Sequence, residues 1–573
     1  MTAIAAPAGS PPRRAALAGE ALAARGGLAL VAAALFVFLA APLIAIFARA
    51  LQDKAGAWIG FANFVQYFSS PAFGRSAGNT LAFALYTTVL TVPLAFVFAY
   101  AIQRSCIRGK WLWRNVALIP ILAPSMLAAL SFIYLFGNQG VFKALLPWVG
   151  LTTIYGMPGM VLAMTFSAFP HAVMILLASL ALSDARLYEA ADSMATSEWR
   201  KFTTITLPGA RYGLVSASMV VFTMAVSEFG VPKVIGGNTS VLAVDIYKQV
   251  IGQQNFNKGA VVSLVLLVPV LLAFIVDWFM RRRLQAQFSS RAVPYVPRRS
   301  PGFDRAMLAF CSAVSVFMLA VLGMAIYTSF IKLWPYDLSF SLRHYVYGLI
   351  DAGVIVDYFN SLKMAFYTAL FGTLFIFAMA YLLEKTRGMA TLKAAVRLVA
   401  TIPMAVPGLV LGLGYIFFFN HPDNPLNGIY GTMAILVLST VVHYYTSSHM
   451  TAVTALKALD DEFESVSASL KVPFYRTFFR VTLPVSLPAV LDIGRYLFVN
   501  GMVTISAVVF LYAPDTRPAS VAILNMDEAG EIGAAAGMAT LIVASSTAVC
   551  VLYAIVTRYL LRRTQAWRAA ARP

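Results

Sequence analysis

The chain has 573 residues, of which 60% are hydrophobic and 12% are charged, and its formal net charge at pH 7 is +19. Soluble domains carry about 25% charged residues, so this composition excludes an ordinary soluble globule, an intrinsically disordered chain and a disulfide-stapled secreted scaffold. Long uncharged windows recur along the whole sequence. They predict an all-α fold, that of a polytopic membrane protein.

About twelve apolar windows are long enough to cross a membrane as helices, since a helix of about 20 residues spans the ~30 Å hydrocarbon core of a bilayer. Six windows fall in each half of the chain, near residues 27–48, 79–102, 115–137, 157–183, 210–228, 259–280, 306–331, 361–383, 396–420, 431–456, 490–512 and 535–557. The first window follows Arg13 and Arg14, as in a signal peptide. It is longer than a usual cleaved signal, so we expect it to be retained.

The positive charges predict the orientation. With the N-terminus in the cytoplasm, about three quarters of the Lys and Arg residues fall in loops on that side, as the positive-inside rule requires. We therefore expect a multi-pass membrane protein with both termini in the cytoplasm. The lipid bilayer accounts for the net charge, and no nucleic-acid partner is needed.

The two halves of the chain repeat each other. The segment Asn79-Thr-Leu-Ala-Phe-Ala-Leu-Tyr-Thr returns as Asn360-Ser-Leu-Lys-Met-Ala-Phe-Tyr-Thr, with five of nine positions identical. Ile119-Pro120 likewise returns as Ile402-Pro403. Because each half has an even number of windows, both copies share one orientation, which predicts two parallel six-helix repeats with a path at their interface.

This repeat divides the chain into five expected segments. They are an N-terminal cytoplasmic tail (1–26), a first six-helix domain (27–283), a basic cytoplasmic linker with several prolines (284–304), a second six-helix domain (305–563) and a C-terminal cytoplasmic tail (564–573).

A repeated loop follows the fourth window of each half. The first copy runs from Tyr188-Glu189-Ala190-Ala191 to Leu207-Pro208, and the second from Ser465 to Leu483-Pro484. Each copy predicts a helix, a break, a short amphipathic helix and a proline stop, with Ser197 suited to cap the first short helix. The exposed aromatic residues suit either a groove on a partner protein or lipid headgroups, and the residues alone leave both interpretations open.

The loop resembles the EAA loop of ABC importer permeases, a Glu-Ala-Ala, then Gly, then Leu-Pro pattern. The resemblance implies a type I ABC importer permease fold and two separate ATP-binding subunits that dock on the two loops. The residues implied for ATPase coupling are Glu189, Ala190, Ala191, Ala195, Trp199, Leu207, Pro208, Ser465, Lys471, Tyr475, Leu483 and Pro484. The pattern's glycine is replaced by Ala195 and Lys471, and Ser465-Val-Ser replaces Glu-Ala-Ala, so we expect a different turn at the break.

The fused two-domain form resembles the ferric-iron and 2-aminoethylphosphonate branch of these importers. Three segments, which begin at Glu228-Phe-Gly, Asp245-Ile-Tyr and Ser506-Ala-Val, resemble 2-aminoethylphosphonate permeases most. The resemblance implies a periplasmic substrate-binding protein as a further partner. It implies 2-aminoethylphosphonate as the substrate, with ferric iron or a polyamine as alternatives.

Glu228 is the acidic residue that stands out, because an ionised group at membrane depth is costly. It either lines the translocation path or pairs with Lys233 or caps a helix end, and its repeat counterpart is Thr504. The His residues and the three cysteines have no metal-ligand spacing, so we expect neither a resident metal nor a cofactor.

The only Gly-Lys pair, Gly109-Lys110, is followed by Trp111, so the chain has no phosphate-binding P-loop. We therefore expect a transporter permease rather than an enzyme, with ATP hydrolysis in partner subunits. The rival interpretations are an ion-coupled secondary carrier, with Glu228 as the coupling carboxylate, and a membrane scaffold without transport.

Overall fold

A computed structural model describes residues 13–286, 293, 295–386, 389–460, 462–470 and 472–564. The N-terminal half is helical, with 3-10 and π turns marked η. Its elements are α1 (Arg13–Leu35), η1 (Phe36–Ala40), α2 (Ala41–Ala50), α3 (Ala62–Phe68), α4 (Pro71–Arg104), α5 (Lys110–Leu118), η2 (Ile119–Leu122), α6 (Ser125–Phe136), η3 (Lys143–Val149), α7 (Met157–Ala181), α8 (Ala185–Ser193), α9 (Glu198–Lys201), η4 (Phe202–Thr206), α10 (Leu207–Ser227), α11 (Gly230–Ile235), α12 (Leu242–Tyr247), η5 (Lys248–Gly252) and α13 (Phe256–Ala286).

The C-terminal half has a similar order, with one short hairpin after its first long helix, in which β1 pairs antiparallel with β2. Its elements are α14 (Pro301–Ser329), β1 (Ile331–Leu333), β2 (Asp337–Phe340), α15 (Arg343–Tyr345), η6 (Val346–Asp351), α16 (Ile355–Lys385), α17 (Ala390–Val399), η7 (Ile402–Ala405), α18 (Gly408–Phe419), η8 (Asn427–Ile429), α19 (Met433–His443), α20 (Tyr445–Lys457), α21 (Glu462–Ser469), α22 (Phe474–Thr477), η9 (Phe478–Thr482), α23 (Leu483–Val503), α24 (Ala519–Glu528) and α25 (Ile532–Thr564).

The predicted polytopic all-α fold is confirmed. Within the described residues, nine helices are long and apolar enough to cross a membrane, and two further helix pairs pass the same test with bends of 101° and 113°. The bends fall at the predicted third and ninth windows, where Pro124 and Pro407 directly precede α6 and α18. Proline has no N–H to donate and its ring clashes with the preceding turn, which breaks the helix there. The tenth window forms the shorter apolar helix α19, followed by α20.

The eleventh window differs from the prediction, because α23 ends at Val503 and not near residue 512. Residues 505–511 turn back among protein side chains instead of continuing into lipid: Ser439 donates to the Ala507 carbonyl at 2.8 Å. A Cβ on Gly408 would lie 2.9 Å from the Ala507 nitrogen, so the glycine permits this close approach. Hydropathy alone does not separate apolar residues that face protein from those that face lipid.

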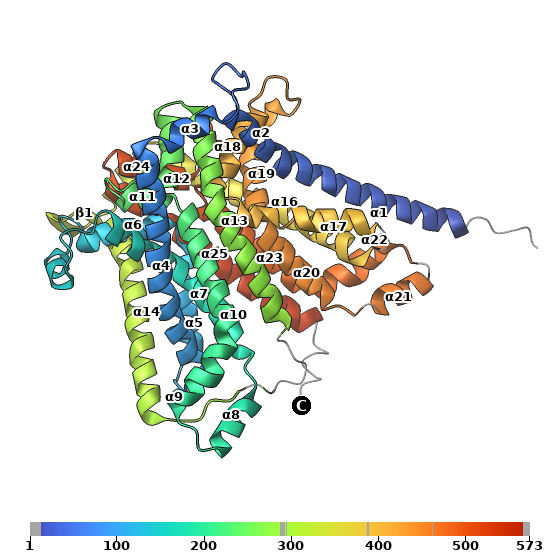
Figure 1. The fold of residues 1–573 in the computed structure, drawn as a ribbon, viewed down its shortest axis with the longest axis horizontal. Coiled ribbons are helices and arrows are strands. Elements are labelled where there is room, and N and C mark those ends of the chain that lie inside the picture. The colour runs from blue at the N-terminus through green and yellow to red at the C-terminus, as the bar shows by residue number, and fades with distance from the viewer. Residues whose placement is uncertain are drawn as a thin grey trace, which may run out of the picture.

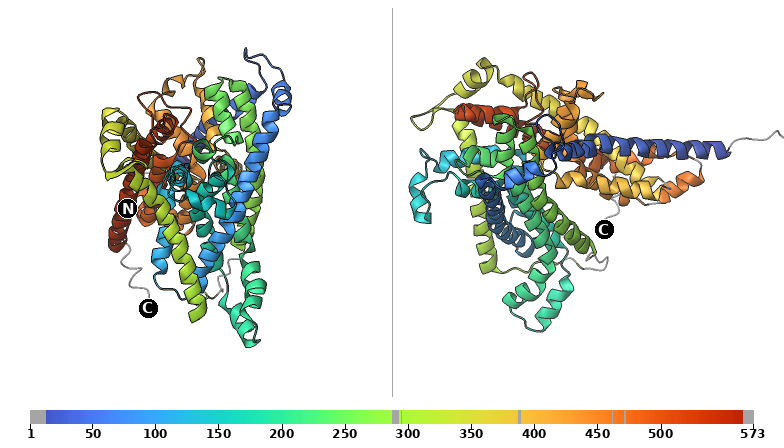
Figure 2. Two further views of the ribbon diagram at one scale, coloured as in Figure 1. Left: turned by 90° about the vertical axis from the view of Figure 1, so that its left-hand side faces the viewer. Right: turned by 45° about the horizontal axis from the view of Figure 1, so that its top comes forward.

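The two halves exchange their first long helices. The helix of α1, η1 and α2 runs along α16–α18 of the C-terminal half, where Tyr415 donates to the Phe38 carbonyl at 2.7 Å (Figures 1 and 2). In return, α14 packs against α6, where the Phe317 and Phe132 rings lie 6.1 Å apart. This exchange ties the halves together on both sides of their interface.

The sequence repeat is also a repeat of contacts. The Asn79 side chain donates to the Ser240 carbonyl at 2.9 Å, and its counterpart Asn360 donates to the Asp515 carbonyl at 2.9 Å. Each bond fixes the start of a long helix, α4 or α16, to the segment before α12 or α24. The two halves therefore fold alike and run in the same direction.

The halves meet near α11 and α24, where Lys233 and Glu528 form an ion pair of 2.6 Å across the interface. Their opposite ends diverge, so that α9 lies at the tip of one half and α22 near the tip of the other (Figure 1). This arrangement leaves space between the halves.

Candidate functional site

A cavity of about 360 Å³ lies between the two halves. Most of its lining residues come in pairs related by the repeat. Pro120 and Pro403 stand at the bends before α6 and α18, and Glu228 and Thr504 follow the ends of α10 and α23. Both path residues predicted from the sequence thus line one cavity.

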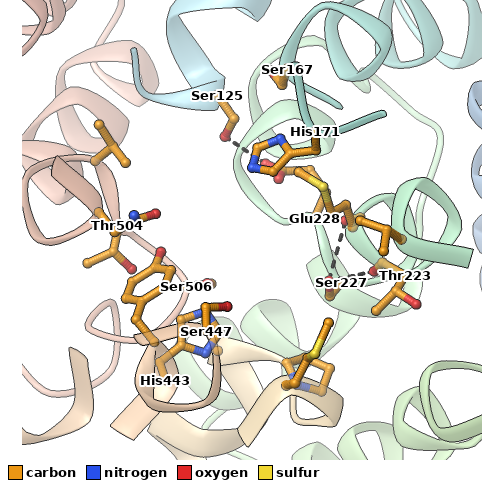
Figure 3. Close-up of a pocket in the computed structure, with 18 of the residues that line it drawn as sticks. Ser125, Ser167, His171, Thr223, Ser227, Glu228, His443, Ser447, Thr504 and Ser506 are labelled. Carbon is orange, nitrogen blue, oxygen red and sulfur yellow. Dashed lines mark hydrogen bonds between the residues drawn. The ribbon is translucent and has the colours of Figure 1, made fainter. Parts of the chain in front are cut away.

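The paired positions carry different chemistry. Ser167 of the first half corresponds to His443 of the second, while His171 corresponds to Ser447, so each half contributes one histidine and one serine in exchanged places. Figure 3 shows Glu228, His171 and Ser125 on one side of the cavity and Thr504, His443 and Ser447 on the facing side. The backbone is nearly twofold symmetric, but the polar lining is not.

Glu228 is held by two donors. Its carboxylate accepts a hydrogen bond from the Ser125 hydroxyl at 2.8 Å and from the Val231 amide at 3.1 Å. The alternative pairing with Lys233 is wrong, because the ammonium of Lys233 pairs with Glu528 and lies over the Tyr247 ring. The capping alternative holds, since Glu228 ends α10 and receives the amide of Val231 in the first turn of α11. These two donors fix the position of the carboxylate.

The remaining lining charge is already compensated. Asp277 pairs with Arg281 at 2.6 Å and accepts from Ser216 at 2.6 Å. All lining residues belong to the described part of the chain, and none of them is Lys or Arg. Glu228 is therefore the one carboxylate of the lining without an ion-pair partner among the described residues.

Two histidines, His171 and His443, for which the sequence shows no metal-ligand spacing, also line this cavity. The Nδ1 atoms of His171 and His443 are buried and have no hydrogen-bond partner among the described residues. The exchange of His and Ser between positions 276 residues apart can be read from the sequence. Only the structure shows that all four side chains line one cavity.

The first loop, residues 182–206, closes by a Schellman motif. The amide of Ala195 donates to Asp192 and that of Thr196 to Ala191, at 2.9 and 3.0 Å. Ala195 has φ of +50°, the left-handed conformation that glycine adopts most easily. Alanine therefore adopts here a conformation that glycine takes at lower cost, and the expectation of a turn different from the family's stays a prediction.

The short helix of this loop does not end at a proline stop as predicted. Ser197 caps α9 through the Arg200 amide, as expected, but α9 continues through the π-turn η4 into α10, with Pro208 in the first turn of α10. A π-turn shifts the hydrogen-bond ladder by one residue, and a proline near a helix start has no amide to satisfy. The loop is thus one rigid arm with the membrane helix.

The predicted coupling residues of the first loop lie along this arm. Glu189, Ala190 and Ala191 belong to α8, and Leu207-Pro208 opens α10. Trp199 on α9 is 74% exposed, whereas its neighbour Phe202 packs inward. Trp199 is the aromatic group that this loop presents at its surface.

The second loop, residues 458–482, has the same plan. Ser465 lies on α21, although its side chain is outside the described atoms, and Lys471 falls outside the described residues. The amide of Val472 donates to Ser467 at 2.9 Å, as Thr196 does to Ala191 in the first copy. Tyr475 on α22 is 49% exposed, and Leu483-Pro484 opens α23 after the π-turn η9.

An aromatic anchor, missed from the sequence, fixes each short helix to a membrane helix. The Phe202 ring lies 5.6 Å from Tyr100 of α4, and the Phe478 ring lies 4.7 Å from Tyr381 of α16. The sequence repeat paired Tyr100 with Tyr381 and Phe202 with Phe478 separately. It held no signal that the two pairs touch.

The fold and its interfacial cavity define the class: a multi-pass membrane transport component made of two parallel repeats. The family model for binding-protein-dependent transport system inner membrane components matches residues 91–285 and 372–566. The chain belongs to this family of ABC transporter permeases.

Among curated relatives, the chain is 27% identical over 541 residues to the ferric transport system permease protein FbpB of Actinobacillus pleuropneumoniae, covering 92% of this chain and 77% of that protein. It is 26% identical over 494 residues to a ferric transport permease of Haemophilus influenzae, covering 84% and 77%. Among solved structures, a bacterial alginate ABC transporter in complex with its periplasmic protein covers 49% of this chain and 100% of its own, at 17% identity and a TM-score of 0.40.

Proposed function

We propose that this chain is the permease subunit of an ATP-driven importer in a bacterial inner membrane, with two separate ATP-binding subunits docked on α9 and α22. Membership of the permease family supports the transport role. The observation that carries the docking role is the pair of short helices, each exposing an aromatic residue and anchored through Phe202 or Phe478 to a long helix. A helix that exposes an aromatic group suits a groove on a protein partner.

The rest of the arrangement follows from this orientation. Both termini and the linker lie in the cytoplasm, and the six-helix domains comprise residues 27–283 and 305–563. The end that carries α11 and α24 receives a periplasmic substrate-binding protein. Closure of the ATPases draws α9 and α22 together and opens the cavity toward the periplasm.

Uptake into proteoliposomes tests this function. The chain is reconstituted with and without its ATPase subunits, with the binding protein and substrate outside. We expect uptake only with ATPases and ATP. Full uptake in the absence of ATPases, driven by a proton gradient and abolished by Glu228→Gln, would establish the secondary carrier instead. No flux with all partners present would establish the scaffold without transport.

We further propose that the substrate presents positive charge to Glu228. The relatives named above are ferric transport permeases, and the cavity holds one uncompensated carboxylate. Ferric iron and polyamines fit this lining. The ammonium group of 2-aminoethylphosphonate, the substrate expected from the sequence, fits it too, but its phosphonate would meet no Lys or Arg among the lining residues.

Calorimetry on the cognate binding protein separates these substrates. The titrants are ferric citrate, spermidine and 2-aminoethylphosphonate. We expect ferric iron or the polyamine to bind at least 100-fold more tightly than the phosphonate. Tight binding of the phosphonate alone would overturn the assignment by charge and restore the substrate expected from the sequence.

A further inference from the structure

The linker between the two halves runs across the first loop. The Val293 carbonyl accepts a hydrogen bond from the Ala185 amide at 2.9 Å. In return, the Val293 amide donates to the Asp184 carboxylate at 3.4 Å. Asp184 also caps the start of α8 through the Arg186 amide at 3.1 Å. The linker is therefore fastened to the helix that carries Glu189-Ala190-Ala191.

An aromatic and cationic cluster forms the second fastening. The guanidinium of Arg104, at the end of α4, lies 4.3 Å from the Tyr295 ring of the linker and 4.9 Å from the Tyr188 ring of α8. The two tyrosine rings lie 4.6 Å apart, and Arg104 is only 7% exposed. A guanidinium stacks on aromatic faces more favourably than an ammonium does, especially where it is desolvated.

Tyr188 connects this cluster to the arm that contains the short helix. Its hydroxyl forms a hydrogen bond of 2.8 Å with Thr206, the last residue of η4. Arg104 also donates to the Leu180 carbonyl at 3.2 Å, near the end of α7. One linker tyrosine is thus connected to α4, α7, α8 and the arm that leads from α9 into α10.

An ion-pair chain forms the third fastening. Arg298 of the linker pairs with Asp192 of α8 at 2.7 Å, and Asp192 also pairs with Lys201 of α9. The hydrogen bond from Lys201, with the charges of Lys201 and Arg298, holds the pKa of Asp192 below its usual value. The Asp192 carboxylate therefore links Arg298 of the linker to Lys201 of α9.

The second loop has different residues at the matching positions. Arg104 corresponds to Lys385, and Tyr188 corresponds to Glu464. Lys385 donates to the Leu459 carbonyl at 3.3 Å. Both the tyrosine of α8 and the arginine of α4 are replaced at these positions, so the aromatic and cationic cluster is particular to the first loop.

We propose that Val293 and residues 295–299 form a strap that positions the first loop against α4, so that the two docking loops differ in stiffness. Tyr295 and Arg298 are its positioning residues. The strap couples movement of α9 directly to α4 and α7, whereas α22 moves against α16 through its aromatic anchor. The consequence for coupling rests on the proposed function, and the strap itself does not.

Hydrogen exchange on the full chain in lipid nanodiscs, without partners, tests the strap. Tyr295→Ala removes both ring contacts, so we expect about tenfold faster exchange in residues 185–206 and no change in residues 472–482. Tyr295→Phe keeps the rings and should restore slow exchange. Val296→Ala, at a 77% exposed neighbouring position, is the matched control and should leave exchange unchanged.

The outcomes are distinguishable. Unchanged exchange in Tyr295→Ala, or equal acceleration in both loops, would overturn the strap. With ATPases added, we expect Tyr295→Ala and Arg298→Ala to raise the ATP hydrolysed per substrate transported at least twofold. An unchanged ratio together with a loosened first loop would overturn the coupling consequence. Failure of ATPases to dock on the wild-type chain would overturn the proposed function and leave the strap standing.

Discussion

The two halves of this molecule share a backbone plan but not a polar chemistry. Both bend at a proline before a short apolar helix, both close a loop by the same Schellman bond and both anchor a short helix by a Phe–Tyr contact. Yet Glu228 faces Thr504, and histidine and serine exchange places across the cavity. The repeat thus determines the backbone plan, and the departures from it determine the polar lining of the cavity.

Glu228→Gln should have the largest effect, because it removes the one charge that distinguishes the two sides of the cavity. Glutamine keeps the size of the side chain and an acceptor for Ser125. We expect uptake to fall by roughly 30-fold or more, since loss of a desolvated charge partner costs ~2–5 kcal/mol. The measurement is initial uptake rate in proteoliposomes. Thr504→Val, at the repeat counterpart, is the matched control and should transport nearly as well as wild type; equal losses in both variants would contradict the asymmetry.

Truncation of the two aromatic anchors should have the next largest effect on uptake, and this effect should differ between the two loops. Phe202→Ala and Phe478→Ala each leave a cavity against a tyrosine, and such truncations cost ~2 kcal/mol or more for a partly buried ring. We expect about a tenfold loss of ATP-driven uptake in Phe478→Ala and a smaller loss in Phe202→Ala, because the strap also holds the first loop. Leucine at either position should restore most of the uptake. A larger loss in Phe202→Ala would count against unequal loops.

A pH-dependent difference between the repeats arises at Asp527 of the C-terminal half. Burial, with the neighbouring Glu528 charge, raises the pKa of Asp527 from 3.8 to about 6. The folded state then holds an extra proton between these values, so stability should decrease as pH rises through that window. The repeat counterpart is Ile251, which does not titrate.

Thermal unfolding of the purified chain measures this effect. The midpoint should decrease by a few degrees from pH 4 to pH 7, and Asp527→Asn should remove that part of the decrease. Glu531→Gln, a nearby exposed acid, is the control and should keep it. A pH profile identical in wild type and Asp527→Asn would show that this carboxyl does not carry the effect.

The smallest effect concerns the turn at the loop break. A non-glycine residue in the left-handed conformation costs roughly 1 kcal/mol, so Ala195→Gly should stabilise the first loop slightly and leave uptake unchanged. Lys471→Gly tests the matching position of the second loop. Hydrogen exchange of the two loops reports both variants, and faster exchange in Ala195→Gly would contradict the account of this turn.

Much of the fold could be predicted from composition and repetition. Hydropathy located the membrane windows, because each long helix must satisfy its backbone within lipid. Hydropathy failed after Val503, where apolar residues turn back against α18. The expectation of a proline stop failed at Leu207-Pro208, where a π-turn continues the helix. Both failures have one cause: the sequence does not show which neighbour satisfies a backbone group.

The site could be predicted only where its residues lie within one motif. The loop pattern located α9 and α22, and the charge of Glu228 indicated a polar position in the path. The Glu228 carboxylate is held by Ser125 of α6, and the neighbours of Tyr188 come from α4 and the linker. These contacts join residues about 80 to 110 positions apart, and no local pattern encodes them.

Labelling from one side of the membrane tests whether α9 and α22 face the same cytoplasmic side and meet ATPases there. Trp199→Cys and Tyr475→Cys, each in a chain whose three native cysteines are replaced, can be labelled with a membrane-impermeant maleimide. Both should label in inverted vesicles only, and ATPase subunits should protect both. Labelling of either cysteine from the periplasmic side, or labelling that ATPases leave unchanged, would contradict the account.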